Sequence, residues 1–98
     1  MLGDKISAQE AAQMGMIYKA IPVEDFQGEV SALANRLSQM PTKGLALTKR
    51  AFSASLGNTL EEQIAVENEA QITASETDDY TEGVQAFIEK RKPQFKGK

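Results

Sequence analysis

The sequence predicts an all-α fold of about five helices. Three observations support this prediction: apolar residues recur at helical spacing, two capping boxes mark helix starts, and Gly or Pro follows four of the five predicted helices. The alternation typical of strands is nearly absent. With 98 residues, we expect residues 1–98 to form a single helical domain.

The first predicted helix begins at a capping box. Ser7 and Glu10 have the spacing at which each side chain binds the backbone amide of the other residue. Gly15 suits the left-handed position that commonly ends a helix. The apolar run at 16–21 is closed by Pro22, and we expect it to be extended rather than helical.

The second predicted helix has the clearest apolar stripe. The stripe consists of Phe26, Val30, Leu33, Ala34, Leu37 and Met40. Pro41 ends this helix, and Thr42 is placed to cap a third helix that Gly57 ends.

Thr59 and Glu62 form a second capping box, which opens a fourth helix that extends to about Ser75. One arc of this helix carries Leu60, Ile64, Val66, Ala70 and Ala74. Glu67 lies within the arc, where a carboxylate needs a partner or a place at the rim. We favour a structural or inter-subunit ion pair over a catalytic role, because no second carboxylate on this face supports acid–base chemistry.

The last predicted helix begins near Asp78 and is terminated by Pro93. Its helical row consists of Tyr80, Val84, Phe87, Ile88 and Arg91. Acids in its first turn and Lys90, Arg91 and Lys92 in its last would complement the helix dipole. The acids Glu76, Asp78 and Asp79 lack the pattern of a calcium loop, and we interpret them as N-terminal capping residues.

Composition excludes several kinds of chemistry. The chain has no Cys and no His, and so lacks a thiolate metal site, the commonest metal ligand and the commonest general base. We therefore assign no catalytic residue and no metal ligand. Few aromatic residues imply a thin core, so we expect the isolated chain to self-associate. No apolar run or leader pattern indicates a membrane or secreted protein, and we expect a cytoplasmic one.

Charge is unevenly distributed. All charged residues between positions 59 and 82 are acidic, and all charged residues between positions 90 and 98 are basic. A solvated surface is the usual explanation of such runs, and a contact with phosphate is the alternative. The bases are too few, and have too few aromatic neighbours, to indicate a nucleic-acid-binding domain.

Phe87 and Lys90 are three residues apart, which would place them on neighbouring positions of one helix face. An aromatic ring beside an ammonium group suits an adenine nucleotide, which offers a base to stack and a phosphate to bind. From spacing alone, we favour a core position for Phe87 and a complement to the helix dipole for Lys90.

The segment at 79–95, DYTEGVQAFIEKRKPQF, resembles the C-terminal signature of the enoyl-CoA hydratase/isomerase (crotonase) family. The segments GDKISAQEA at 3–11, GMI at 15–17 and LTKRA at 47–51 are similar to the part of that family that follows its catalytic core. The tail PQFKGK at 93–98 looks like the ring-epoxide isomerase branch, which handles phenylacetyl-CoA derivatives. The resemblance covers essentially the whole chain.

The resemblance implies that this chain is the C-terminal trimerisation and coenzyme A-contacting region of a longer acyl-CoA hydratase or isomerase. In that family a ββα spiral domain carries the oxyanion hole and the acid–base carboxylates, and nothing here corresponds to it. The parent protein would therefore be the enzyme, and this chain alone would not be catalytic. In the family's Ala-Phe-x-x-Lys motif, the Phe and the Lys contact the adenine and phosphate end of coenzyme A. The matching residues are Phe87 and Lys90.

The resemblance also implies an acyl-CoA substrate, no required cofactor, and assembly into a trimer or a dimer of trimers. Neither nucleic acid nor a membrane is an expected partner. The alternative is a free-standing helical interaction module with no role in coenzyme A binding. The reading frame upstream would distinguish the two, because only the first requires a spiral domain there.

Overall fold

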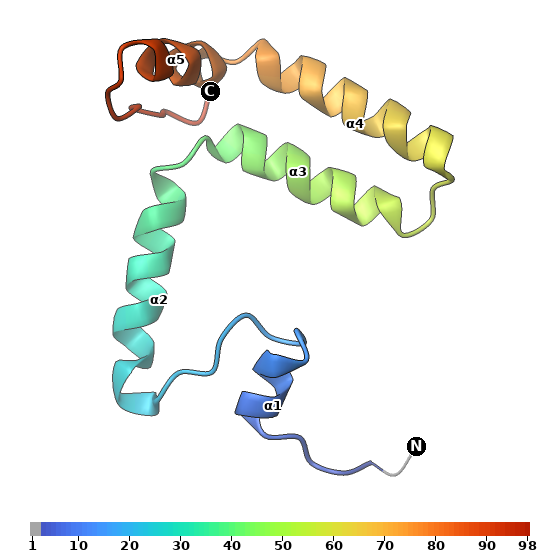
Figure 1. Cartoon of the computed structure of the whole chain (residues 1–98), viewed down its shortest axis with the longest axis vertical. Coiled ribbons are helices and arrows are strands. Elements are labelled where there is room, and N and C mark those ends of the chain that lie inside the picture. Colours follow the sequence, from blue (N-terminus) through green and yellow to red (C-terminus); the bar gives the residue numbers. More distant parts are fainter. Residues whose placement is uncertain (1–2) are drawn as a thin grey trace. The chain divides into compact units, whose positions relative to one another are not determined.

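The computed structural model describes residues 3–98, which form five helices and contain no strand. The predicted all-α fold is therefore confirmed for this part of the chain. Contacts divide the chain into two compact units, one that ends at Ala34 and one that runs from Asn35 to Lys98. Figure 1 shows the order of the helices along the chain.

The first unit contains α1 (Ala8–Gln13) and most of α2 (Val23–Ser38). The predicted capping box at the start of α1 is present. The Ser7 hydroxyl accepts from the Glu10 amide at 3.2 Å, and the Glu10 carboxylate accepts from the Ser7 amide at 2.9 Å. Gly15 ends the helix with φ +74°, as predicted. The segment at 16–22 bends at residues 16–18 and is neither helix nor strand, so the prediction that the apolar run at 16–21 is not helical is confirmed.

The apolar stripe of α2 is exposed. Its members Phe26, Val30, Leu33 and Leu37 are all accessible to solvent, and no residue of the helix is buried. Just before the helix, the Lys19 ammonium binds the Glu29 carboxylate at 2.7 Å. The described part of the chain therefore leaves the apolar side of α2 uncovered.

The second unit is organised around a helical hairpin. Helices α3 (Thr42–Ser55) and α4 (Leu60–Ser75) lie antiparallel and side by side, joined by a short loop (Figure 1). The predicted capping box opens α4, with the Thr59 amide donating to Glu62 at 2.7 Å. Thr42 does not cap α3, so that prediction was wrong. Pro41 is the N-cap residue, without a side-chain cap, and Thr42 is already helical.

The arc of α4 that faces α3 differs from the predicted one. Val66, Ala70 and Ala74 are partly buried as expected, but Leu60 and Ile64 are exposed. Gln63 takes their place, because its side-chain amide donates to the backbone carbonyl of Ala51 on α3 at 3.2 Å. The face of α4 that meets α3 thus includes a polar residue, while Leu60 and Ile64 lie outside it.

Helix α5 (Asp78–Ile88) follows α4 after a two-residue break, and residues 89–98 then fold back along it. The prediction that Lys90, Arg91 and Lys92 form its last turn was wrong, because α5 ends at Ile88 with Glu89 as its C-cap. Among residues 3–98, only Thr77, Asp79 and Ala86 are buried, and all three lie at α5. The thin core that the composition predicted is therefore concentrated at this helix.

Candidate functional site

The site predicted from sequence lies at the C-terminal end of α5, where Phe87 and Lys90 occur. Phe87 is 85% exposed, so the expectation that it is a core residue was wrong for this chain. Tyr80, Val84 and Ile88, which share its helical row, are exposed as well. The buried side of α5 is the opposite one, which the folded-back tail covers.

Lys90 lies just beyond the helix rather than on its face. Its φ is +53°, and it is the non-glycine residue with positive φ in the described part of the chain. The Lys90 amide donates to the carbonyl of Phe87 at 3.3 Å, and the Arg91 amide donates to that of Ala86 at 3.0 Å. These two bonds form a Schellman motif, in which Lys90 occupies the position usually taken by glycine.

The same motif occurs at the end of α1 with glycine in that position. There the Gly15 amide donates to Ala12 at 3.1 Å and the Met16 amide donates to Ala11 at 2.9 Å. Glycine adopts this left-handed conformation without the clash that a Cβ causes. The lysine at the end of α5 thus occupies an unfavourable backbone conformation that a glycine would relieve.

The Lys90 side chain is exposed and takes part in none of the ion pairs or hydrogen bonds found among residues 3–98. Its neighbour Arg91 is engaged on both sides. The guanidinium binds Glu82 at two points, 2.6 and 2.9 Å, and its Nε donates to Glu89. The Lys90 ammonium, which forms no ion pair in the described part of the chain, therefore lies next in sequence to a guanidinium that is paired with two carboxylates.

Glu82 also holds the tail. Its carboxylate accepts from the Gln94 amide at 2.7 Å in addition to Arg91. The hydrogen bonds from Arg91 and then from Gln94 lower the pKa of Glu82 to about 2. The carboxylate is thus charged at neutral pH and binds two segments that follow the helix.

Asp79 is the second anchor of the tail. Its side chain is buried, with the residue 3% exposed, and its two oxygens accept from the Lys96 amide at 2.6 Å and the Gly97 amide at 2.8 Å. Its own amide donates to the carbonyl of Lys98 at 3.0 Å. The interpretation of Asp79 as a capping residue was therefore wrong. The cap is Thr77, whose hydroxyl accepts from the Tyr80 amide at 3.0 Å.

Two close approaches complete the tail. The Phe95 ring lies over Gly83, where an added Cβ would come within 3.5 Å of the ring. Gly97 has φ +75°, and a Cβ there would lie 2.6 Å from the hydroxyl oxygen of Thr42 on α3. The tail thus packs against both α5 and the first residue of α3.

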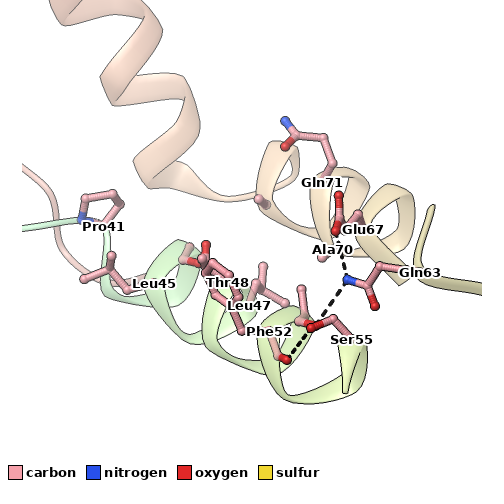
Figure 2. Close-up of a pocket in the computed structure, with 13 residues that line it drawn as sticks. Pro41, Leu45, Leu47, Thr48, Phe52, Ser55, Gln63, Glu67, Ala70 and Gln71 are labelled. Carbon is pink, nitrogen blue, oxygen red and sulfur yellow. Dashed lines mark hydrogen bonds between the residues drawn. The ribbon is translucent and has the colours of Figure 1, made fainter. Parts of the chain in front are cut away.

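An apolar hollow of about 420 Å³ adjoins Phe87. Tyr80, Val84 and Phe95 line it from α5 and the tail, and Gly44 lines it from α3. A larger hollow of about 620 Å³ lies between α3 and α4, as Figure 2 shows. In the larger one, Gln63 donates to both the Ala51 carbonyl and Glu67, so its polar groups satisfy one another.

Glu67 therefore has a neutral partner. Gln63 binds it at 2.8 Å, and it takes part in none of the ion pairs among residues 3–98 (Figure 2). An ion pair within the chain, one form of the prediction, was thus wrong, while an inter-subunit pair stays a prediction. In the described part of the chain, no cluster of three or more acidic residues could hold a metal ion, and no helix is long and apolar enough to cross a membrane.

The roles of Thr77, Asp79, Glu82 and Arg91 were not predicted from the sequence. A threonine directly before two aspartates at a helix start was a signal for Thr77, because Thr and Ser are preferred N-caps. No local pattern indicated that Asp79 and Glu82 bind a segment more than ten residues later. The end of α5 was missed because no glycine marks it.

Comparison with known proteins places these features in a family context. The sequence profile described as enoyl-CoA hydratase/isomerase matches residues 1–98. A Rhodobacter capsulatus protein named "Probable enoyl-CoA hydratase" is 43% identical over 98 residues, which is 100% of this chain and 38% of that protein. The 1,2-epoxyphenylacetyl-CoA isomerase of Escherichia coli is 41% identical over the whole chain, which covers 37% of it.

Solved structures give the same result. The crystal structure of an enoyl-CoA hydratase from Polaromonas sp. JS666 superposes with a TM-score of 0.89 at 30% identity, over 96% of this chain and 37% of that one. The enoyl-CoA hydratase from Bacillus anthracis superposes with a TM-score of 0.84 at 32% identity, over 95% of this chain and 36% of that one. The chain thus spans less than two fifths of the length of each of these proteins.

Proposed function

Because the chain belongs to the enoyl-CoA hydratase/isomerase family, we propose that it is the C-terminal helical region of a longer acyl-CoA enzyme, where it contacts coenzyme A and drives trimer formation. On this proposal residues 1–98 act as one region of that enzyme. Two relatives at 43% and 41% identity carry the names of a hydratase and of an epoxide isomerase. The proposed chemistry is therefore hydration or isomerisation of an acyl-CoA, through a thioester enolate that an oxyanion hole outside this chain stabilises.

One observation carries the proposed contact with coenzyme A: an exposed aromatic ring and a free ammonium at the same helix end. Phe87 is 85% exposed, and Lys90 keeps an unpaired side chain in a backbone conformation that disfavours any residue except glycine. Residues in strained backbone conformations cluster at active sites and ligand-binding sites. We assign Phe87 to stacking on adenine and Lys90 to a phosphate of coenzyme A.

Binding of ligand fragments tests this assignment. In the full-length protein, Phe87→Ala and Lys90→Ala should each weaken the binding of coenzyme A in isothermal titration. Neither should affect the binding of pantetheine, because pantetheine lacks both the adenine base and the phosphates. Lys92→Ala is the matched control, since it removes an equal charge two residues away. If neither Phe87→Ala nor Lys90→Ala weakens coenzyme A binding more than Lys92→Ala does, the assignment is wrong.

The proposed assembly is supported by the apolar side chains that this chain leaves exposed. The row of Phe26, Val30, Leu33 and Leu37 on α2 is accessible, as are Leu60 and Ile64 on α4. Contiguous apolar surface of this kind marks association sites. We propose that these rows contact other copies of the chain in a trimer or a dimer of trimers.

Light scattering tests the assembly. Leu33→Asp should lower the measured mass of the full-length protein, because it places a charge in the proposed interface. Asn35→Asp, two residues further along α2 and outside the apolar row, introduces the same carboxylate and should leave the mass unchanged. A strict monomer for the unmodified protein at high concentration would contradict the proposal.

A further inference from the structure

The turn that carries Lys90 is held from both sides by charged side chains. Before it, Glu89 is the C-cap of α5 and accepts from both Gln85 and Arg91. After it, the Arg91 guanidinium reaches back to Glu82, nine residues earlier. The left-handed residue thus lies between two residues whose side chains are bound to each other and to the helix.

The geometry of Arg91 suits a clamp. An isolated ion pair at a protein surface contributes little, but two-point guanidinium–carboxylate contacts within a network are the exception. Here both terminal nitrogens of Arg91 bind Glu82, its Nε binds Glu89, and Glu82 also accepts the Gln94 amide. The network therefore fixes the direction of the backbone on both sides of Lys90.

The two Schellman turns of this chain differ in what they need. Gly15 adopts φ +74° with no steric penalty, and it has no side chain to present. Lys90 adopts φ +53° against such a penalty. Without an external restraint, the turn at Lys90 would populate other backbone conformations, and each would point the ammonium elsewhere.

We propose that Arg91 is a positioning residue, which clamps the turn to Glu82 and Glu89 and so presents the Lys90 ammonium to a phosphate. This inference rests on the proposed coenzyme A contact and adds to it the device that makes the contact productive. When only a fraction of the protein molecules have the conformation that binds a ligand, the apparent affinity for that ligand is reduced by the same fraction. Loss of the clamp should thus weaken phosphate binding although Arg91 itself touches no ligand.

Isothermal titration of the full-length protein with coenzyme A tests the clamp. If Lys90 is then correctly placed about one fifth of the time, Arg91→Gln weakens binding by about fivefold. Arg91→Lys keeps the charge but loses the two-point contact, and it should weaken binding in the same direction. Lys92→Gln removes a neighbouring charge that no carboxylate binds, and it should change affinity by less than about twofold.

The direction in which Glu82→Ala changes coenzyme A affinity distinguishes the clamp from a purely electrostatic effect of the Glu82 charge. Glu82→Ala removes a negative charge, which by electrostatics alone would strengthen binding of an anion. If the clamp operates, Glu82→Ala weakens binding, because Arg91 loses its main anchor. In the Lys90→Ala background, Arg91→Gln should have no further effect, since Arg91 acts only through Lys90.

The outcomes are distinct. The positioning role is overturned if Arg91→Gln and Lys92→Gln weaken binding equally, if Glu82→Ala strengthens it, or if the effects of Arg91→Gln and Lys90→Ala simply add. In each of these cases a loss with Lys90→Ala would still support the proposed function. If Lys90→Ala binds coenzyme A normally, the proposed contact and the positioning role are both wrong.

Discussion

Replacement of Lys90 by glycine should stabilise the fold while it removes the proposed phosphate contact. Lys90 has φ +53°, and its side chain is exposed and forms none of the bonds found among residues 3–98. The substitution therefore removes backbone strain and no contact within the chain. Lys90→Ala is the matched comparison, because it removes the same side chain and keeps a Cβ in the left-handed conformation.

The magnitude follows from two opposing contributions. A residue with a Cβ in the left-handed region costs about 1–2 kcal/mol, which glycine avoids. Glycine in turn loses more backbone entropy on folding, by about 0.5–1 kcal/mol. The net gain in the free energy of unfolding for Lys90→Gly is then about 0.5–1 kcal/mol. Lys90→Ala should change it by less than about 0.5 kcal/mol, as is usual for exposed sites.

Urea unfolding at one fixed protein concentration, followed by far-ultraviolet circular dichroism, measures this difference. With an m value of about 1 kcal/mol/M, Lys90→Gly should raise the urea midpoint by about 0.5–1 M relative to Lys90→Ala. Both variants should lose coenzyme A affinity equally. Equal midpoints for the two variants, or a lower one for Lys90→Gly, would show that the left-handed turn carries no strain, and the support it gives to a functional Lys90 would be lost.

Three further predictions concern the tail. Asp79→Asn should cost about 1–3 kcal/mol of stability, since one buried N–H loses its acceptor. It should also speed hydrogen exchange of the amides at 96 and 97. Asp78→Asn, at an exposed position, should have neither effect. Gly97→Ala should destabilise the docked tail by about 1–2 kcal/mol and expose it to carboxypeptidase digestion, because its φ is +75° and its Cβ would meet a threonine hydroxyl at 2.6 Å; resistance equal to that of the unmodified chain would contradict this. The pKa of Glu82 is lowered in the folded protein, to about 2 from its usual 4.5, so its contribution to stability is complete above pH 4.5 and lost as pH falls through about 2. The Gln94 amide resonance should shift over that range in NMR spectra, and a shift centred at pH 4.5 would refute the Glu82 contact.

Helix positions were predictable because their signals are local. The capping boxes at Ser7 and Thr59 bind residues three positions away, so sequence spacing alone specifies them. The stripe of α2 was recognised for the same reason, but its surroundings were not. An apolar stripe indicates that one face of a helix is apolar, but only the tertiary structure shows whether the same chain covers that face.

The errors concentrate where distant residues meet. Asp79 was read as a capping acid because nothing near it in the sequence shows that residues 96 and 97 donate to it. Gln63 is polar and yet faces α3, where its side-chain amide donates a hydrogen bond to the Ala51 carbonyl. Lys90 was predicted to lie inside the helix because no glycine marks the left-handed turn that ends α5.

The small number of buried residues has a consequence for how this chain responds to mutation. Among residues 3–98, only Thr77, Asp79 and Ala86 are buried, so few side chains can contribute to stability through the chain's own interior. A partner that covers the exposed apolar rows, and that does not bind the unfolded chain, stabilises the fold by mass action. Apparent melting temperatures will then rise with the concentration of that partner. If these rows contact other copies of the chain, as proposed, substitutions in them will change the dissociation constant of that assembly more than the folding of a single chain.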